Sequence, residues 1–132
     1  MSLKNAVFKT GATWSPTGGS DLTLIADGRN PPNGLSMIVS NDTSLITRRR
    51  MVCVSTLPGL PTNPQSYAKL ARNKLTYRIP FVASDGKLYT QTVEISMAFH
   101  AEDNTKSVHV RDVAAFVADS DFLDFWDKSL LT

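Results

Sequence analysis

The sequence is poor in the side chains on which catalysis and metal binding most often depend. Its 132 residues include a single cysteine, Cys53, and only two histidines, His100 and His109. Neither a Cys-x-x-Cys nor a His-x-x-x-His spacing occurs, which argues against a structural zinc site. Cys53 lies in the apolar run Met-Val-Cys-Val, where a cysteine is more often an inert core residue than a nucleophile. We therefore expect no catalytic residues, no cofactor and no metal.

Long apolar runs and glycine-rich phosphate-binding motifs are missing as well. No apolar segment approaches the roughly 18–20 residues that cross a bilayer, and the N-terminal segment has no signal-peptide hydrophobic region. The sequence contains neither a P-loop nor a Gly-x-Gly-x-x-Gly motif. A lone cysteine forms no intrachain disulfide, which fits a reducing compartment. From these absences we expect that the protein has no membrane partner and no small-molecule substrate.

The charge is unevenly distributed along a chain of single-domain size. The apolar content of 42% and the charged content of 20% are typical of a folded domain. Residues 101–132 contain seven acidic and three basic side chains, a net charge of −4. The whole chain has a formal net charge of +2, so the first 100 residues carry a net charge of +6. A basic segment joined to an acidic one indicates a partner of opposite sign on one side. Chance scatter of surface charge is the alternative.

The first 99 residues show the alternation and the turn residues of antiparallel strands. We expect strands at residues 6–10, 21–26, 35–40, 48–56, 73–81 and 88–99. The first two flank a Gly/Ser/Pro loop and predict an N-terminal hairpin. Asp-Gly within residues 83–87 predicts a tight hairpin between the last two. The Asn-Gly that ends residues 27–34 suits a turn that needs a positive φ.

After His100 the apolar residues recur at helical spacing. They are Val110, Val113, Ala114 and Val117 in a first set, and Phe122, Leu123, Trp126 and Leu130 in a second. Asn104 or Thr105 is placed to cap the first helix, and Ser120-Asp121 the second. Strands followed by helices predict one α+β domain, with the sheet in residues 1–99 and the helices in residues 100–132.

The predicted helices are too short to cover the apolar face of a sheet with five or so strands. A second copy that supplies its own helices would complete the cover. We therefore expect an obligate homodimer in which the helices of each subunit cross onto the sheet of the other. A monomer with a compact two-layer core is the alternative.

The strand at residues 73–81 alternates between an apolar and a polar row. If it pairs with residues 88–99 through the tight hairpin, one sheet face carries Lys74, Thr76, Arg78, Thr90, Thr92, Glu94 and Ser96. Small hydroxyl groups flanked by cations suit phosphates and base edges. A solvated face, which many antiparallel sheets have, is the alternative interpretation.

Three stretches of the sequence resemble one known family. "DLTLIADGRNPPNGL" is similar to a strand and its NP-x-NG turn, "NKLTYRIPFV" to a basic fifth strand, and "TVEISMAF" to a sixth strand. The family is that of the coat proteins of single-stranded RNA bacteriophages, the leviviruses, and the first part is most similar to the Q-beta type. The order of a hairpin, a five-stranded sheet and two C-terminal helices also matches, so the resemblance covers essentially the whole chain.

The resemblance implies a structural protein of the virion without enzymatic activity. Coat proteins of this family form interlocked homodimers whose two sheets join edge to edge, and the dimers assemble in the bacterial cytoplasm into an icosahedral capsid around genomic RNA. In several members the sheet also binds an RNA hairpin and represses translation. The implied RNA-binding residues are Arg49 or Arg50, Lys74, Thr76, Arg78, Thr90, Thr92 and Glu94.

The sequence departs from the family at three places. Thr90 stands where the family has a base-stacking tyrosine, and the strand parity turns the neighbouring Tyr89 toward the core unless a bulge intervenes. The connection at residues 83–87 is short and has no cysteine, so we expect no disulfides between dimers. The connection at residues 56–72 is longer than usual, and we expect it to contribute contacts between dimers.

Two other functions remain open on the sequence alone. One is a dimeric RNA-binding regulator that never assembles, which particle formation would distinguish from a coat protein. The other is a small enzyme that uses His100 and Glu94, which would require these two side chains to line one pocket.

Overall fold

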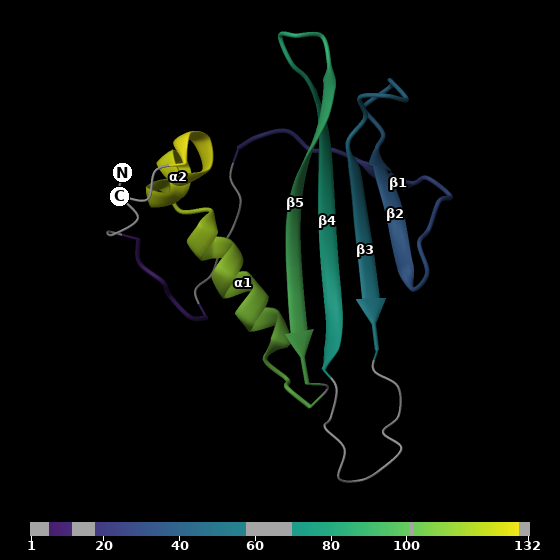
Figure 1. Cartoon of the computed structure of the whole chain (residues 1–132). Coiled ribbons are helices and arrows are strands. Elements are labelled where there is room, and N and C mark those ends of the chain that lie inside the picture. The colour runs from purple at the N-terminus through teal and green to yellow at the C-terminus, as the bar shows by residue number, and fades with distance from the viewer. Residues whose placement is uncertain (1–5, 12–17, 58–69, 101, 130–132) are drawn as a thin grey trace. The chain divides into compact units, whose positions relative to one another are not determined.

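The computed structural model describes residues 6–11, 18–57, 70–100 and 102–129 (Figure 1). The chain forms two compact units. One unit consists of residues 19–101 and contains the sheet. The other combines residues 1–18 with residues 102–132 and contains the helices.

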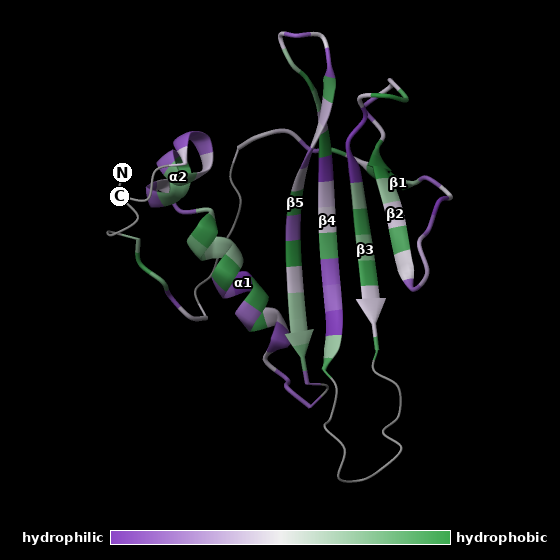
Figure 2. Ribbon diagram, in the orientation of Figure 1, coloured by the Kyte–Doolittle hydropathy of each residue, from purple (hydrophilic) through white to green (hydrophobic). Residues whose placement is uncertain are grey.

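The first unit is a five-stranded antiparallel sheet. Its strands are β1 (Leu24–Ala26), β2 (Gly34–Val39), β3 (Arg50–Thr56), β4 (Ala71–Val82) and β5 (Leu88–Phe99). Their order in the sheet is β1-β2-β3-β4-β5, so each strand pairs with its neighbours in sequence. The alternation of hydrophobic and hydrophilic residues along β4 and β5 is visible in Figure 2, whereas β3 has an uninterrupted apolar run after Arg50. The predicted antiparallel sheet is confirmed.

The longest ladder of the sheet joins β4 to β5. It runs without interruption from Ala71 opposite Phe99 to Val82 opposite Leu88. The strands are joined by the predicted tight hairpin, in which Gly86 has a φ of 79° and its N–H donates to the carbonyl oxygen of Ala83 at 2.9 Å. Glycine adopts this φ without steric cost, which is why the Asp-Gly sequence closes so short a connection.

The turn between β1 and β2 uses its Asn-Gly pair in two different ways. Asn33 takes the positive φ, at 58°. Gly34 instead permits a close approach, since a Cβ atom there would lie 2.7 Å from the carbonyl oxygen of Cys53 and 2.7 Å from Cγ of Pro31. The predicted turn is confirmed, and a side chain at Gly34 would collide with the backbone of β3.

The predicted N-terminal hairpin is wrong. Residues 6–11 form no strand, and β1 pairs with β2 instead. The reason is a set of contacts with the helical unit that alternation in the sequence does not reveal. The carboxylate of Asp112 accepts hydrogen bonds from the Thr10 hydroxyl at 2.7 Å and from the Gly11 N–H at 2.9 Å.

The helical unit contains both predicted helices. They are α1 (Lys106–Val117) and α2 (Leu123–Lys128), and the short 3₁₀ helix η2 (Ser120–Phe122) leads into the second. Thr105 is the N-cap residue of α1, and its N–H donates to the Asp103 carboxylate at 2.8 Å. The N-cap of η2 is Asp119, one residue before the predicted signal, and its carboxylate accepts from the Asp121 N–H at 2.9 Å.

A cluster of aromatic rings packs the helical unit. Phe116 makes edge contacts with Phe8 at 5.3 Å and with Phe122 at 4.8 Å between ring centroids. Phe125 lies 4.8 Å from Trp126, whose Nε1–H donates to the carbonyl oxygen of Val117 at 3.0 Å. Leu130, the last residue of the predicted apolar set, lies outside the described residues.

We expect Asp112→Ala to destabilise the helical unit by about 1–3 kcal/mol, because it leaves the two donors of the N-terminal segment without their acceptor. Asp112 is 6% exposed, so water does not readily replace the carboxylate. Asp127→Ala, which removes an exposed carboxylate from α2, is the control and should cost less than about 0.5 kcal/mol. Urea denaturation measures both, and equal effects would contradict the anchoring role of Asp112.

Candidate nucleic-acid interface

The pairing register decides which side chains share a face of the sheet. Residues directly opposite each other in antiparallel strands point to the same side. Arg50 lies opposite Arg78, which in turn lies opposite Thr92. What we call the polar face comprises Arg50, Val52 and Val54 of β3, Arg72, Lys74, Thr76 and Arg78 of β4, and Thr90, Thr92, Glu94 and Ser96 of β5.

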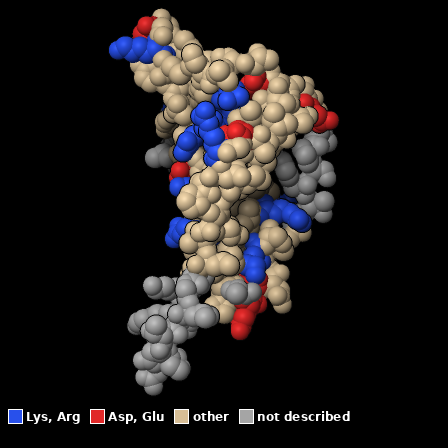
Figure 3. Space-filling view, turned by 90° about the vertical axis from the view of Figure 1, so that its right-hand side faces the viewer, with Lys and Arg blue, Asp and Glu red and all other residues tan. Residues whose placement is uncertain are grey.

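Several cations of the polar face have acidic or hydroxyl partners within the chain. Lys74 Nζ lies 3.2 Å from Oε1 of Glu94. In the register Glu94 is opposite Thr76, so the ion pair runs diagonally between β4 and β5. Arg72 donates to the Ser96 hydroxyl at 3.1 Å. In the part of the chain that the structure describes, Arg78 forms no ion pair. Figure 3, viewed from the side of β1 and β2, shows basic and acidic side chains interspersed.

Asp27, the residue after β1, lies beside Arg50. Its carboxylate accepts from the Arg29 N–H and the Ser36 hydroxyl, each at 2.8 Å, and Oδ2 lies 3.2 Å from Arg50 Nε. The hydrogen bond from Arg29 lowers the pKa of Asp27; burial opposes this, and Ser36 and Arg50 lower the pKa further. Arg50 Nε is close enough for an ion pair but is not aligned for a hydrogen bond. The guanidinium is therefore attracted by Asp27 without being locked by it.

The register also shows which of the two candidate arginines at the start of β3 lies on the polar face. Arg50 is on the polar face, whereas Arg49 binds Asp42 through its backbone N–H at 2.8 Å, Nε at 2.9 Å and Nη2 at 3.0 Å. The hydrogen bonds from Arg49 lower the pKa of Asp42 to about 2. The carboxylate of Asp42 and then the hydroxyl of Tyr77 raise the pKa of Arg49. The structure thus gives Arg49 a role in the β2–β3 turn.

No protein-family model and no curated protein matches the chain. Among solved structures, it is similar to the virus-like particle of bacteriophage GQ-907, with 32% sequence identity and a TM-score of 0.82. The match covers 99% of this chain and 100% of the other. The chain belongs to the RNA phage coat proteins. Its five-stranded antiparallel sheet followed by two C-terminal helices is the RNA phage coat fold, as the sequence resemblance predicted.

The remaining candidate residues of the coat protein lie on the polar face. Thr90 is opposite Pro80 and Thr92 opposite Arg78. Thr76 is only 7% exposed, so its hydroxyl is closed to solvent in the single chain. The structure therefore brings seven of the eight candidates to one face, all except Arg49.

Tyr89 is directed as its parity predicts. It lies opposite Phe81, on the face away from Lys74 and Arg78, and its hydroxyl donates to the Asp85 carboxylate at 2.9 Å. The uninterrupted register of β4 and β5 leaves no bulge that could turn it over. Among the described residues of β4 and β5, the polar face of this coat protein thus has no aromatic side chain for base stacking.

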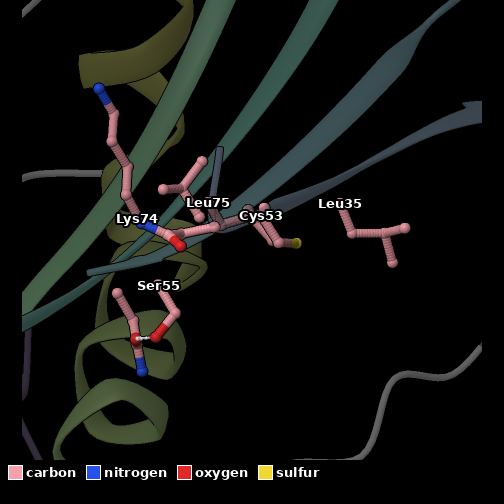
Figure 4. A pocket seen from close by; sticks show the side chains of 9 residues that line it. Leu35, Cys53, Ser55, Lys74 and Leu75 are labelled. Atoms are coloured by element: carbon pink, nitrogen blue, oxygen red, sulfur yellow. Dashed lines mark hydrogen bonds between the residues drawn. The ribbon is translucent and has the colours of Figure 1, made fainter. Parts of the chain in front are cut away.

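The other face of the sheet has a shallow hollow of about 570 Å³ over β2, β3 and β4 (Figure 4). It is lined by Leu35, Cys53 and Leu75, and at one end the Ser55 hydroxyl bonds Oδ1 of Asn73 at 2.7 Å. Figure 4 shows the Lys74 side chain leading away from Cys53 and Leu35. The lone cysteine of the coat protein is accordingly half-buried in an apolar surface of the single chain and not in a closed core, which the sequence context favoured.

The residues considered for other chemistry do not come together. His100 and Glu94 are six positions apart on one extended segment, a separation of about 20 Å at the rise of a strand. Among the described residues, no three His, Cys, Asp or Glu side chains are grouped so that they could bind a metal ion. No described helix has the length and apolarity needed to cross a membrane.

Asp27 and Arg72 are parts of this face that the sequence reasoning missed. Arg72 could have been found, because it continues the alternation of Lys74 toward the start of β4. Asp27 could not, because its contact with Arg50 joins segments that meet only through the pairing of β2 with β3.

Proposed function

We propose that this coat protein forms a homodimer whose polar face binds single-stranded genomic RNA inside an icosahedral capsid. Family membership supports a capsid protein located in the virion. The observation that carries the finer proposal is the contrast between the two faces of the sheet. One face presents cations and hydroxyl groups, and the other presents large apolar side chains to solvent.

The exposed apolar side chains support the dimer. On β5, Val93 is 51% exposed and Ile95 42%, and both lie on the face away from Lys74 and Arg78. In the helical unit, Val113 is 51% exposed and Trp126 59%. Monomeric proteins rarely leave so many large apolar groups in contact with water. Exchange of helices between two subunits would bury both sets.

Within the described residues β5 is one edge of the sheet, and the three-residue strand β1 is the other. The outer edge of this twelve-residue strand presents backbone N–H and C=O groups that can form hydrogen bonds with a strand of another chain. Edge-to-edge pairing of two β5 strands would give the dimer one continuous sheet and one continuous polar face. RNA would then contact cations from both subunits.

The cations of the polar face support RNA as the ligand. Arg50 and Arg78 are directly opposite each other, and like charges at such a position destabilise a sheet. The Asp27 carboxylate lies beside Arg50, whereas Arg78 forms no ion pair among the described residues, so a phosphate group would supply the anion that Arg78 lacks. Since Thr90 replaces the stacking tyrosine, we expect binding of an operator hairpin, and thus translational repression, to depend on backbone contacts and to discriminate weakly between hairpins.

Expression of the chain in bacteria tests the proposal. We expect particles visible by electron microscopy that contain RNA protected from added nuclease, assembled in the host cytoplasm. The released RNA should be degraded by the same nuclease once the particles are dissociated. Soluble RNA-binding dimers without particles would instead favour the non-assembling regulator.

A further inference from the structure

We propose that the connection between β2 and β3, residues 41–47, is a contact between neighbouring dimers, in which Leu45 and Ile46 are buried against a second copy of the chain. This inference rests on the proposed function, because it requires dimers that assemble. It concerns a surface that neither the dimer nor the RNA site uses.

The first observation is the exposure of two adjacent aliphatic side chains. Leu45 is 79% exposed and Ile46 is 70% exposed, so neither contributes to the core of the sheet unit. A single exposed leucine is ordinary on a protein surface. Two neighbouring large aliphatic residues on one turn form an apolar patch, and such patches mark interaction sites.

The second observation is that this turn is held in shape. Asp42 closes it through three hydrogen bonds from Arg49, and the Asp42 N–H donates to the carbonyl oxygen of Val39 at 3.1 Å. Inside the turn, the Ser44 hydroxyl accepts from the Ile46 N–H at 3.3 Å, and the Ser44 carbonyl oxygen accepts from the Arg48 N–H at 3.2 Å. A preorganised segment loses less conformational entropy when it binds. The turn therefore presents its aliphatic pair in a defined position.

The third observation concerns the occupant. Residues 43–47 are Thr-Ser-Leu-Ile-Thr and carry no charge. Of the charged residues that flank them, Asp42 and Arg49 neutralise each other, and the half-buried Arg48 is a single remaining cation. An uncharged apolar patch does not attract RNA, and it meets an identical copy without repulsion. The similar chain of bacteriophage GQ-907 comes from a virus-like particle, in which copies of one chain are neighbours.

The place of the turn agrees with this assignment. In the pairing register, the start of β3 at Arg50 lies opposite Arg78, so residues 41–47 are at the same end of the sheet as the hairpin at residues 83–87 (Figure 1). That end also exposes Phe81 and Val82. The two faces and the β5 edge are assigned to RNA and to the dimer partner, which leaves the ends of the sheet for contacts between dimers.

The test compares L45S/I46S with L45M/I46M, which keeps the apolar area. Purified dimers are reassembled with RNA, and light scattering gives the protein concentration at which particles form. We expect L45S/I46S to raise that concentration at least about tenfold and L45M/I46M to change it less than about threefold. Dimer mass by light scattering and affinity for a single-stranded RNA oligonucleotide should be unchanged in both.

Three results would overturn the inference. They are assembly of L45S/I46S at the unchanged concentration, an equal loss in L45M/I46M, and loss of the folded dimer in L45S/I46S, which would assign the pair to subunit stability. A failure of the unsubstituted chain to form particles would contradict the proposed function, and this inference with it.

Discussion

Trp126→Ala is expected to lower the free energy of unfolding of the dimer by about 3–5 kcal/mol, the usual cost of removing a buried tryptophan. In the single chain Trp126 is 59% exposed, and its contacts are the rings of Phe125 and Phe122 and one hydrogen bond to Val117. Those contacts alone account for about 2–3 kcal/mol. A larger loss requires that a second subunit covers the ring.

Denaturation at two protein concentrations measures this effect, because the stability of an obligate dimer depends on its concentration. Trp126→Phe is the matched control: it keeps an aromatic ring and removes the Nε1–H donor, so it should cost only about 1 kcal/mol. If Trp126→Ala costs no more than Trp126→Phe, the ring is not covered by a partner. That result would refute the exchange of helices.

Replacing both Arg50 and Arg78 with alanine is expected to produce the largest loss of RNA affinity. With two phosphate contacts removed, the slope of log K against log salt for single-stranded RNA should fall by about 1.4. Each single substitution should contribute about half of that. The dimer should remain intact, because both side chains lie on the polar face of the sheet.

Arg49→Ala provides a control of the same residue type at the neighbouring position. Arg49 binds Asp42, so its loss should destabilise the β2–β3 turn without changing the salt slope. Fluorescence anisotropy with a labelled oligonucleotide at several salt concentrations measures all four variants. A slope that falls with Arg49→Ala and not with the Arg50 and Arg78 substitutions would reverse the assignment of the two faces.

The strands with strict alternation could be predicted from the sequence alone. Residues 88–99 were expected as a strand and form β5 with the same bounds, and Asp-Gly marked the hairpin before it. These signals are local, since each residue's face follows from its parity. The N-terminal hairpin failed for the opposite reason. Residues 6–11 are fixed by Asp112, about one hundred positions away, and no local pattern records that contact.

For the candidate site, the sequence predicted which residues of one strand share a face, but not which residues of different strands do. Lys74, Thr76 and Arg78 lie on one face because they belong to a single alternating strand. The run Arg48-Arg49-Arg50 left the register of β3 open, since three consecutive arginines give no parity signal. Only the pairing of Arg50 with Arg78, and the capture of Arg49 by Asp42, decides it.

Electron cryomicroscopy of particles formed by the intact chain tests the central claim most directly. We predict two subunits joined along β5 in one continuous sheet, with RNA density inside the shell against Arg50 and Arg78 and the helices on the outer surface. Subunits that share no sheet, or RNA density against the face that contains Cys53 and Leu75, would contradict the account.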